Sequence, residues 1–275
     1  MTDQLELEDG TNRLVEDRLE GRLYELDVVV EGAVDRPTAA ALGPALNALY
    51  ARALAALLVD PTLGGLVCDI REGSDAGPSF ELAINHRPFA GPSAAFALHC
   101  VVVYWQAEGV PARREAILEA LVAALGANTA GPDPCVRELL LGALIADLET
   151  ALGLPILRNI DRPVEAAAGV PVAVFHDGDQ RANDENLGLV LYTARPALEL
   201  FVPGGDAGVL DGLVQTALAT IRGTDRPGGI GLELVEVDTD PEVLRQAYSG
   251  PLLAARIEME LTYGTFPGKP YAAAG

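Results

Sequence analysis

Apolar and polar residues alternate with a regular period over much of the chain, and one patterned stretch occurs twice. From Leu46 to Ile70, an apolar stripe with helical spacing leads through a Gly-Gly turn into an alternating strand. Leu210 to Leu234 overlays on this stretch without a gap. The apolar positions of the first copy are Leu46, Leu49, Tyr50, Leu54, Leu57, Leu66, Cys68 and Ile70. They coincide with Leu210, Leu213, Val214, Leu218, Ile221, Ile230, Leu232 and Leu234.

A second pair of matching stretches follows, at 90–105 and 249–264, each opened by a Gly-Pro pair. Alternate positions are apolar in both, and they lead to Tyr104 and Tyr263. The opposite face is largely apolar at 97–103 and polar at 256–262. We therefore expect the first of these strands to be covered on both faces and the second to be solvated on one.

The segments between these stretches carry turn and cap signals. Residues 5–10 and 172–178 both read as strands that end in an Asp-Gly turn. Pro196 lies inside an apolar run at 189–205 and predicts an edge strand or a break between two strands. Asp206 is placed to cap the second repeated helix. The copies diverge at 71–87, which reads as a polar loop, and at 241–248, which predicts a helical turn.

Two helices separate the copies, at 113–125 and 135–152. The second leads directly into the second copy, whereas no helix precedes the first copy. Either the helix 113–125 folds back to supply it, which makes the first copy circularly permuted, or it is a plain linker. We predict an α+β fold of two similar domains, 1–126 and 127–275, each a mainly antiparallel sheet flanked by helices.

Composition narrows the possible functions. The chain is 49% hydrophobic and carries a net charge of −21. It has no basic patch, and the most basic stretch is the pair Arg113-Arg114. Tight nucleic-acid binding is therefore not expected. Neither a membrane span nor a signal peptide is apparent. Cys68 and Cys100 take inward strand positions, which predicts core packing for both.

Residues with catalytic potential do not form a recognisable motif. His86 and His176 fall in expected loops and His99 in a strand, while the carboxylates Glu258 and Glu260 follow strand alternation. The run 176–179 resembles an Asp-Gly turn more than a metal site. We predict no catalytic, cofactor-binding or metal-binding residues, no cofactor and no enzymatic activity.

The order of these segments resembles a known family. The stretches VFHDGD, GGIGLELVEVD and ELTYGTFPGKPY, together with DPTLGGLVCDIREG in the first copy, are similar to the tail-terminator, or tail-completion, proteins of long-tailed bacteriophages and gene-transfer particles. The resemblance covers 136–271 best and 5–105 as a second copy. It implies an α+β structural protein that forms a ring, caps the tail tube and joins it to the head-side connector. This chain departs from the family in carrying two copies.

The resemblance also implies partners and a location. These are further copies of the chain in a trimeric or hexameric ring, the tail tube protein and the head-side connector or stopper protein. DNA would pass through without tight binding, no membrane is involved, and the protein would be assembled in the host cytoplasm into the head-proximal end of the virion tail. The candidate partner contacts lie in 71–87 and in the C-terminal tail: Arg71, Glu72, Asp75, Phe80, His86, Arg87, Phe266, Lys269 and Tyr271.

Three hypotheses remain open at this point. The first is the tail terminator, and the second is another neck or tail component, such as a tube protein or a head–tail connector. The third is a small-molecule-binding α+β protein, which the missing catalytic motif disfavours. Open-ended tubes formed in vitro would favour the second hypothesis, and a ligand-dependent rise in melting temperature the third.

Overall fold

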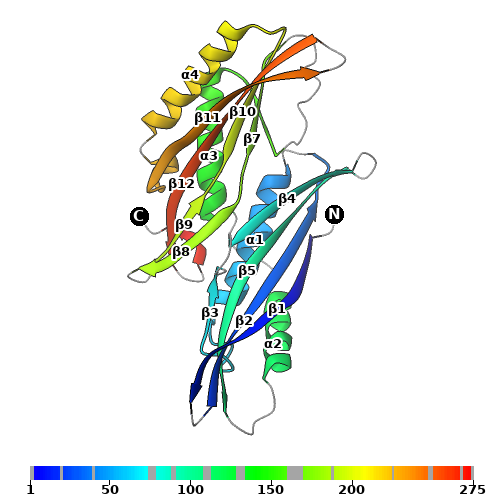
Figure 1. Ribbon diagram of the computed structural model, residues 1–275, viewed down its shortest axis with the longest axis vertical. Helices are drawn as coiled ribbons and strands as arrows, with labels where there is room; N and C mark the ends of the chain where they lie inside the picture. The colour runs from blue at the N-terminus through cyan, green and yellow to red at the C-terminus, as the bar shows by residue number, and fades with distance from the viewer. Residues whose placement is uncertain are drawn as a thin grey trace.

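The computed structural model describes residues 3–18, 21–38, 41–73, 79–87, 91–107, 113–127, 134–159, 170–186, 189–224, 226–246, 250–266 and 269–273. Figure 1 shows an elongated molecule with the first half of the chain at one end and the second half at the other. We use "first half" for the elements from β1 to α2, and "second half" for those from α3 to β13.

The first half contains five strands and two helices among the described residues. In chain order they are β1 (Asp3–Arg18), β2 (Gly21–Asp35), α1 (Leu42–Leu58), β3 (Asp69–Glu72), β4 (Phe80–Arg87), β5 (Gly91–Ala107) and α2 (Arg114–Ala127). The strands lie in the order β1, β2, β5, and both β3 and β4 pair with the far side of β5.

The second half contains the remaining elements. They are α3 (Val136–Leu152), β6 (Ile156–Arg158), β7 (Val172–His176), β8 (Gln180–Asn186), β9 (Leu189–Ala194), β10 (Ala197–Pro203), α4 (Ala207–Gly223), the short 3-10 turn η3 (Pro227–Gly229), β11 (Glu233–Gln246), β12 (Gly250–Phe266) and β13 (Lys269–Ala273). β7 and β8 pair with β10 and β9, these two pair with β12, and β11 pairs with the far side of β12.

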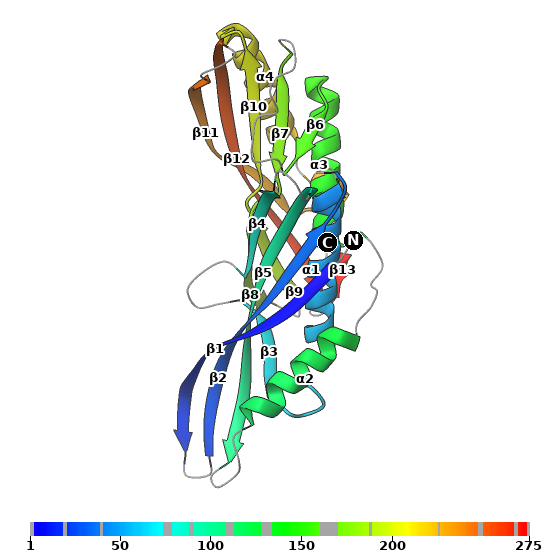
Figure 2. The same ribbon diagram turned by 90° about the vertical axis from the view of Figure 1, so that its right-hand side faces the viewer.

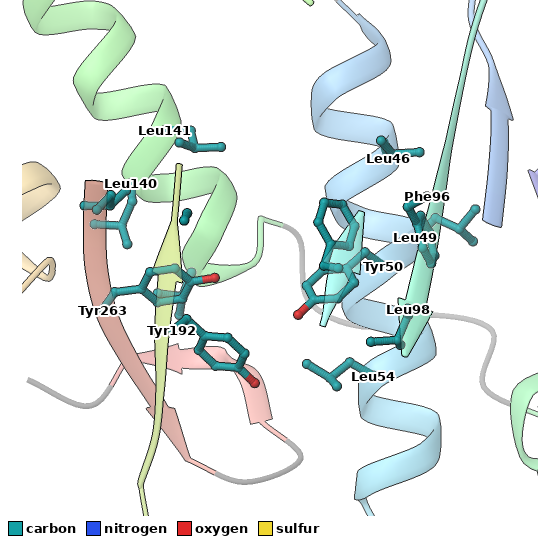
Figure 3. Close-up of a cluster of buried hydrophobic side chains, with 14 of the residues drawn as sticks. Leu46, Leu49, Tyr50, Leu54, Phe96, Leu98, Leu140, Leu141, Tyr192 and Tyr263 are labelled. Carbon is teal, nitrogen blue, oxygen red and sulfur yellow. The ribbon is translucent and has the colours of Figure 1, made fainter. Parts of the chain in front are cut away.

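Thirteen strands form a single sheet, and of the pairings described only β6 with β7 is parallel. Figure 2 shows α1, α2 and α3 along one side of this sheet. α4 packs against α3 and against β10, β11 and β12. The core lies between the helices and the sheet, and Figure 3 shows part of it around α1 and α3. The prediction of an α+β fold built on a mainly antiparallel sheet is confirmed.

Rows of residues that lie opposite one another across the strands correspond between the two halves. One row of the first half consists of Asn12, Leu26, Val102 and Ile70. Its counterpart in the second half consists of Gln180, Ala194, Leu261 and Leu234. A neighbouring row consists of Leu7, Val30, Leu98 and Phe80, and its counterpart of Phe175, Leu198, Ile257 and Thr239. Residues in corresponding places are called equivalent below.

Side chains at equivalent places also make similar contacts. Tyr24 stacks on Tyr104 with ring centroids 5.5 Å apart, and Tyr192 stacks on Tyr263 at 5.2 Å. The strand pair β3–β5 begins with the Cys68 amide donating to the Val103 carbonyl at 2.7 Å. In the second half the Leu232 amide donates to the Thr262 carbonyl at 2.9 Å. The backbone geometry therefore repeats closely.

The helices α2 and α3 also resemble each other, although α2 follows its strands and α3 precedes them. Each packs against the long helix of its own half, α2 against α1 and α3 against α4. Each has an Arg-Glu pair in its first turn. Arg114 donates to the Gly10 carbonyl at 3.4 Å, and Arg137 donates to the Gly178 carbonyl at 2.6 Å.

Two local predictions are confirmed. The run around Pro196 is broken into β9 and β10, because proline lacks the amide that a continuous ladder needs. Both strands pair on two sides, so neither is an edge strand. Asp206 caps α4, with its carboxylate accepting from the amides of Gly208 and Val209 at 3.0 and 3.2 Å.

Three local predictions are wrong. The expected loop 71–87 is mostly strand, because β3 extends to Glu72 and β4 begins at Phe80. The expected helical turn at 241–248 is instead part of β11 as far as Gln246, because 241–246 pair with 250–255 in a long hairpin. Cys68 is exposed, because β3 begins one residue later.

The outer face of β5 is less covered than predicted. Val101 is buried, with 6% of its surface exposed, whereas Ala97, His99 and Val103 are only partly buried. The corresponding face of β12 exposes Arg256 and Glu258, as its polar pattern predicts.

Equivalent leucines of the two long helices provide a test of the core. Leu54 of α1 and Leu218 of α4 are 2% and 6% exposed. Replacing either with alanine removes buried methyl groups and leaves a cavity, so we expect each variant to lose about 2–5 kcal/mol of unfolding free energy. Urea unfolding followed by Trp105 fluorescence measures the loss.

Val122→Ala provides the control, because Val122 is 56% exposed on α2. It should change stability by about 0.5 kcal/mol or less. Equal effects of Val122→Ala and Leu54→Ala would contradict the assignment of Leu54 to the core.

Candidate functional site

The two halves meet at a contact that we call the junction. Its first-half side consists of α1, β3 and β4, and its second-half side consists of α3, β6, β8, β9, β13 and residues 177–179. Phe80 of β4 lies opposite Gln180 of β8 in an antiparallel bridge, which makes the sheet continuous. The Ser79 hydroxyl donates to the Gln180 carbonyl at 3.3 Å and accepts from the Ala182 amide at 2.8 Å.

Buried charges lie at the centre of the junction. Arg158 of β6 forms paired hydrogen bonds with Asp177, at 2.6 and 2.9 Å, and with Glu138, at 2.6 and 2.7 Å. Asp177 is fully buried and Arg158 is 7% exposed. Bidentate pairing of this kind satisfies the planar guanidinium and both carboxylates at once. A Cβ added at Gly43 would lie 2.6 Å from Nε of Arg158, so α1 comes this close because it carries glycine there.

Arg137 of α3 connects this cluster to the first half. It donates to the side-chain oxygen of Asn47 on α1 and to the carbonyls of Asp177 and Gly178. Its guanidinium carbon lies 4.7 Å from the ring centre of Phe80. Asn47 in turn donates to Glu138 at 2.8 Å. Asn47 and Arg137 are 0% and 2% exposed, so their hydrogen bonds are made within the protein, although Nε of Arg137 has no hydrogen-bond partner among the described residues.

The pKa values follow from this arrangement. Burial raises the pKa of Asp177, but the guanidinium groups of Arg158 and Arg137 outweigh burial and leave that pKa below its ordinary value. Burial lowers the pKa of Arg158, but Asp177 and Glu138 outweigh it and leave that pKa above its ordinary value. The cluster therefore stays ionised within the fold.

A second polar network crosses the junction through tyrosines. Tyr50 of α1 and Tyr192 of β9 each donate to Glu72 at 2.8 Å. Gln180 donates to the Tyr50 hydroxyl at 2.8 Å and accepts from Tyr263. In Figure 3 the hydroxyl of Tyr50 points toward the second half, and those of Tyr192 and Tyr263 point toward the first. Burial raises the pKa of Glu72, against the opposing effect of the tyrosine hydrogen bonds.

The structure places the predicted partner contacts of 71–87 in different environments. Arg71 is exposed on β3 and pairs with Glu25 at 2.8 Å. Glu72 belongs to the tyrosine network, and Phe80 is fully buried against Tyr50 and Phe96. Glu72 and Phe80 therefore join the two halves and are not on the outer surface.

The other three predicted contacts of this segment are Asp75, His86 and Arg87. Asp75 lies outside the described residues. His86 and Arg87 end β4, where their backbones lie opposite Pro92 and Gly91 in the hairpin with β5.

The predicted C-terminal contacts lie on a folded strand. β13 pairs with β12 at Thr265 and Phe266, and it packs against both α1 and α3. Phe266 is 44% exposed, Lys269 is exposed and Tyr271 is partly buried. The segment 269–273 therefore lies alongside the junction.

The side of the sheet away from α1–α3 carries paired charges. A hollow of about 670 Å³ on this face is lined by residues from β4, β10 and β12. Within it, Glu199 lies 3.2 Å from Nε2 of His176 and accepts from Arg256 at 2.8 Å, and these neighbours lower the pKa of Glu199 despite its partial burial. A second hollow of about 280 Å³ lies over β1, β2, β4 and β5.

No motif in the sequence singles out Asn47, Arg137, Arg158 or Gln180. One signal was available, because Asn47 is a polar residue on the apolar face of a predicted helix. The arginines gave no such signal, since a single arginine near a helix start or in a short strand is common on protein surfaces.

No family model matches the sequence, and a search of curated proteins found no match. Across the part of the chain that the structure describes, no three His, Cys, Asp or Glu side chains are grouped so as to hold a metal ion. Within the same residues, no helix is both long enough and apolar enough to cross a membrane.

Asp177→Asn tests the buried cluster. The substitution leaves Arg158 and Arg137 without a full counter-charge, so we expect a loss of about 3–5 kcal/mol of unfolding free energy at neutral pH. A carboxylate whose pKa is lowered in the fold stabilises the fold above its unfolded pKa, and this contribution is lost as the pH falls through the folded value. The difference in unfolding free energy between Asp177→Asn and the parent chain should therefore become smaller below pH 3.8, the ordinary pKa of an aspartate. Urea unfolding across pH measures it.

The control is Asp69→Asn, because Asp69 is exposed on β3. It should change stability by about 0.5 kcal/mol or less. A loss for Asp177→Asn that is independent of pH would exclude the proposed role of its charge.

Proposed function

We propose that the chain is a tandem pair of tail-terminator-like domains, 1–126 and 127–275. Three observations support this origin: the equivalent cross-strand rows, the equivalent tyrosine pairs, and the overlay of Leu46–Ile70 on Leu210–Leu234. We further propose that the first domain is circularly permuted. In support, α2 packs against α1 and β1, and Arg114 binds the Gly10 carbonyl as Arg137 binds the Gly178 carbonyl.

The proposed function is structural. The protein forms a ring that caps a virion tail tube, ends its polymerisation and joins the tail to the head-side connector. One structural observation supports this proposal in addition to the family resemblance. The two halves contact each other through two different surfaces, in a heterologous arrangement. The β3–β4 side of the first half meets β8, which is equivalent to part of β1. Contacts between two different surfaces, repeated around an axis, are the kind that close into rings.

Charge is consistent with this function. A net charge of −21 disfavours tight contact with the phosphate backbone, so DNA can pass through the ring without being held. Six equivalent domains would arise from three copies of the chain, whereas six copies would place two domains in each repeat of the ring. The tube protein and the connector are the partners that this function requires.

Native mass spectrometry and negative-stain microscopy of the purified chain test the proposal. We expect closed rings of three or six copies, and particles with unterminated tails when the gene is deleted from its virus or prophage. A stable monomer at virion-like concentrations, combined with normal tails after deletion, would refute it. Open-ended tubes would instead assign the protein to the tail tube.

A further inference from the structure

Two long strands, β1 and β11, lie at outer edges of the sheet, one in each half of the molecule. Within the described residues, β1 pairs only with β2 and β11 pairs only with β12. Both strands are long, at 16 and 14 residues. Their outer backbone amides and carbonyls are thus available to another strand.

Each outer edge is equivalent to one side of the internal junction. β11 and α4 correspond to β3, β4 and α1, which form its first-half side. β1 and α2 correspond to β7, β8 and α3, of which β8 and α3 belong to its second-half side. The molecule therefore exposes, one in each half, a second copy of each surface that it joins internally.

We propose that β11 and α4 of one copy dock against β1 and α2 of the next copy, repeating the internal junction between chains. The inference rests on the proposed ring and identifies its contact surface. Internally, Phe80 lies opposite Gln180. Thr239 is equivalent to Phe80, and Asn12 is equivalent to Gln180. Thr239 of one copy then lies opposite Asn12 of the next, in an antiparallel ladder.

Charge complementarity supports this docking. Arg137 of α3 donates to Asn47 of α1 across the internal junction. Arg114 corresponds to Arg137, and Asp211 takes the place of Asn47 when the repeated helices are overlaid. Within the chain, Arg137 meets the neutral amide of Asn47. Between chains, Arg114 would meet the negatively charged carboxylate of Asp211. Asp211 is exposed in the single chain, whereas Asn47 is fully buried.

The tyrosine contact has a counterpart as well. Tyr192 donates to Glu72 across the internal junction. Tyr24 is equivalent to Tyr192, and Glu236 is equivalent to Glu72. Glu236 already accepts from Arg222 and Thr239 in its own chain, so it is held in place on β11. Docking brings Tyr24 of the next copy toward it.

Exposed apolar side chains gather on the same two edges. Leu14 and Val15 of β1 are 47% and 48% exposed, and Val235 and Val237 of β11 are 45% and 59% exposed. Contact between the two edges buries such side chains and supplies a hydrophobic driving force.

The contact between chains lacks three features of the internal junction. No described strand of the first half corresponds to β13, which packs against α1 within the chain. The first half has no strand corresponding to β6 among its described residues, so the Arg158 ion pairs are missing. Pro241, equivalent to Leu82, has no amide to donate as Leu82 does to Asp179. The contact therefore depends more on exposed charges and should weaken with salt.

Cysteine pairing tests the register. The variant Asn12→Cys with Thr239→Cys, built on Cys68→Ser, keeps the buried Cys100 and Cys135. Residues directly opposite in an antiparallel ladder have Cα atoms about 4.5–5.5 Å apart, within disulfide reach. We expect mild oxidation to yield chains linked by this disulfide, seen as multimers on non-reducing gels and mapped by peptide mass.

The matched control moves one cysteine by one residue. Arg13→Cys with Thr239→Cys places the two thiols on opposite faces of the ladder and should cross-link at least about tenfold more slowly. Equal rates for the two pairs, or cross-links between cysteines of the same chain, overturn the proposed register.

Charge reversal tests the docking without added cysteines. Asp211→Arg and Arg114→Asp each place like charges together, so each should raise the concentration needed for half-assembly at least about tenfold. The double variant should return it to within about threefold of the parent. Because both residues lie on helix surfaces, circular dichroism and urea unfolding of each variant verify that it is folded.

The outcomes separate this inference from the ring itself. This contact is refuted if mass measurement shows rings but the variant Asn12→Cys with Thr239→Cys forms no disulfide between chains. It is also refuted if the double charge variant assembles as poorly as its single variants. Either result leaves the proposed ring function intact. A chain that remains monomeric at every concentration refutes both.

Discussion

Two buried arginines determine how the halves of this protein meet. A guanidinium group keeps its charge at every relevant pH and carries five N–H donors in a fixed plane. Arg158 finds its acceptors on Asp177 and Glu138, and Arg137 finds its own on Asn47 and on two backbone carbonyls. All of these charged partners lie in the second half, and the first half reaches them through Asn47, which accepts from Arg137 and donates to Glu138. A different alignment of the halves would bury Arg137 without this acceptor, and a buried donor without a partner is costly. The alignment that makes the sheet continuous at Phe80 and Gln180 therefore depends on the contacts of Asn47 with Arg137 and Glu138.

Equivalent backbones carry different surfaces in the two halves. α1 is covered on several sides, with Asn47, Tyr50 and Ala51 all buried beneath the second half or the sheet. α4 has the same relation to its own strands, but its buried residues are Leu210, Ala217, Leu218 and Ile221. Positions equivalent to the buried junction residues are polar on α4, at Asp211 and Gln215. The two long helices thus bury similar apolar residues against their own strands and differ at the surfaces that face outward from each half.

Periodicity in the sequence was sufficient for the α+β class, the two long helices and the strand break at Pro196, because these depend on local backbone chemistry and on burial of one face. Periodicity gave wrong predictions where pairing between strands outweighed the local secondary-structure preference of a segment. The stretch 241–246 has helical composition, yet it extends the hairpin between β11 and β12. Phe80 looked like a loop residue because its burial comes from Arg137, Tyr50 and Phe96, which are distant in sequence. The junction was unpredictable for the same reason, since each of its partners is an ordinary residue by itself.

The place of α2 in the chain affects how the protein folds during synthesis. α3 leaves the ribosome before the strands that it covers, whereas α2 leaves after all the strands of the first half. The contact of α2 with β1 joins segments near 114–127 and 3–18, so the first half closes only when its last helix has emerged. Contacts between such distant segments form slowly, and until then part of α1 stays uncovered. The position of α2 after its strands thus delays completion of the N-terminal half until the next helix of the chain is about to be made.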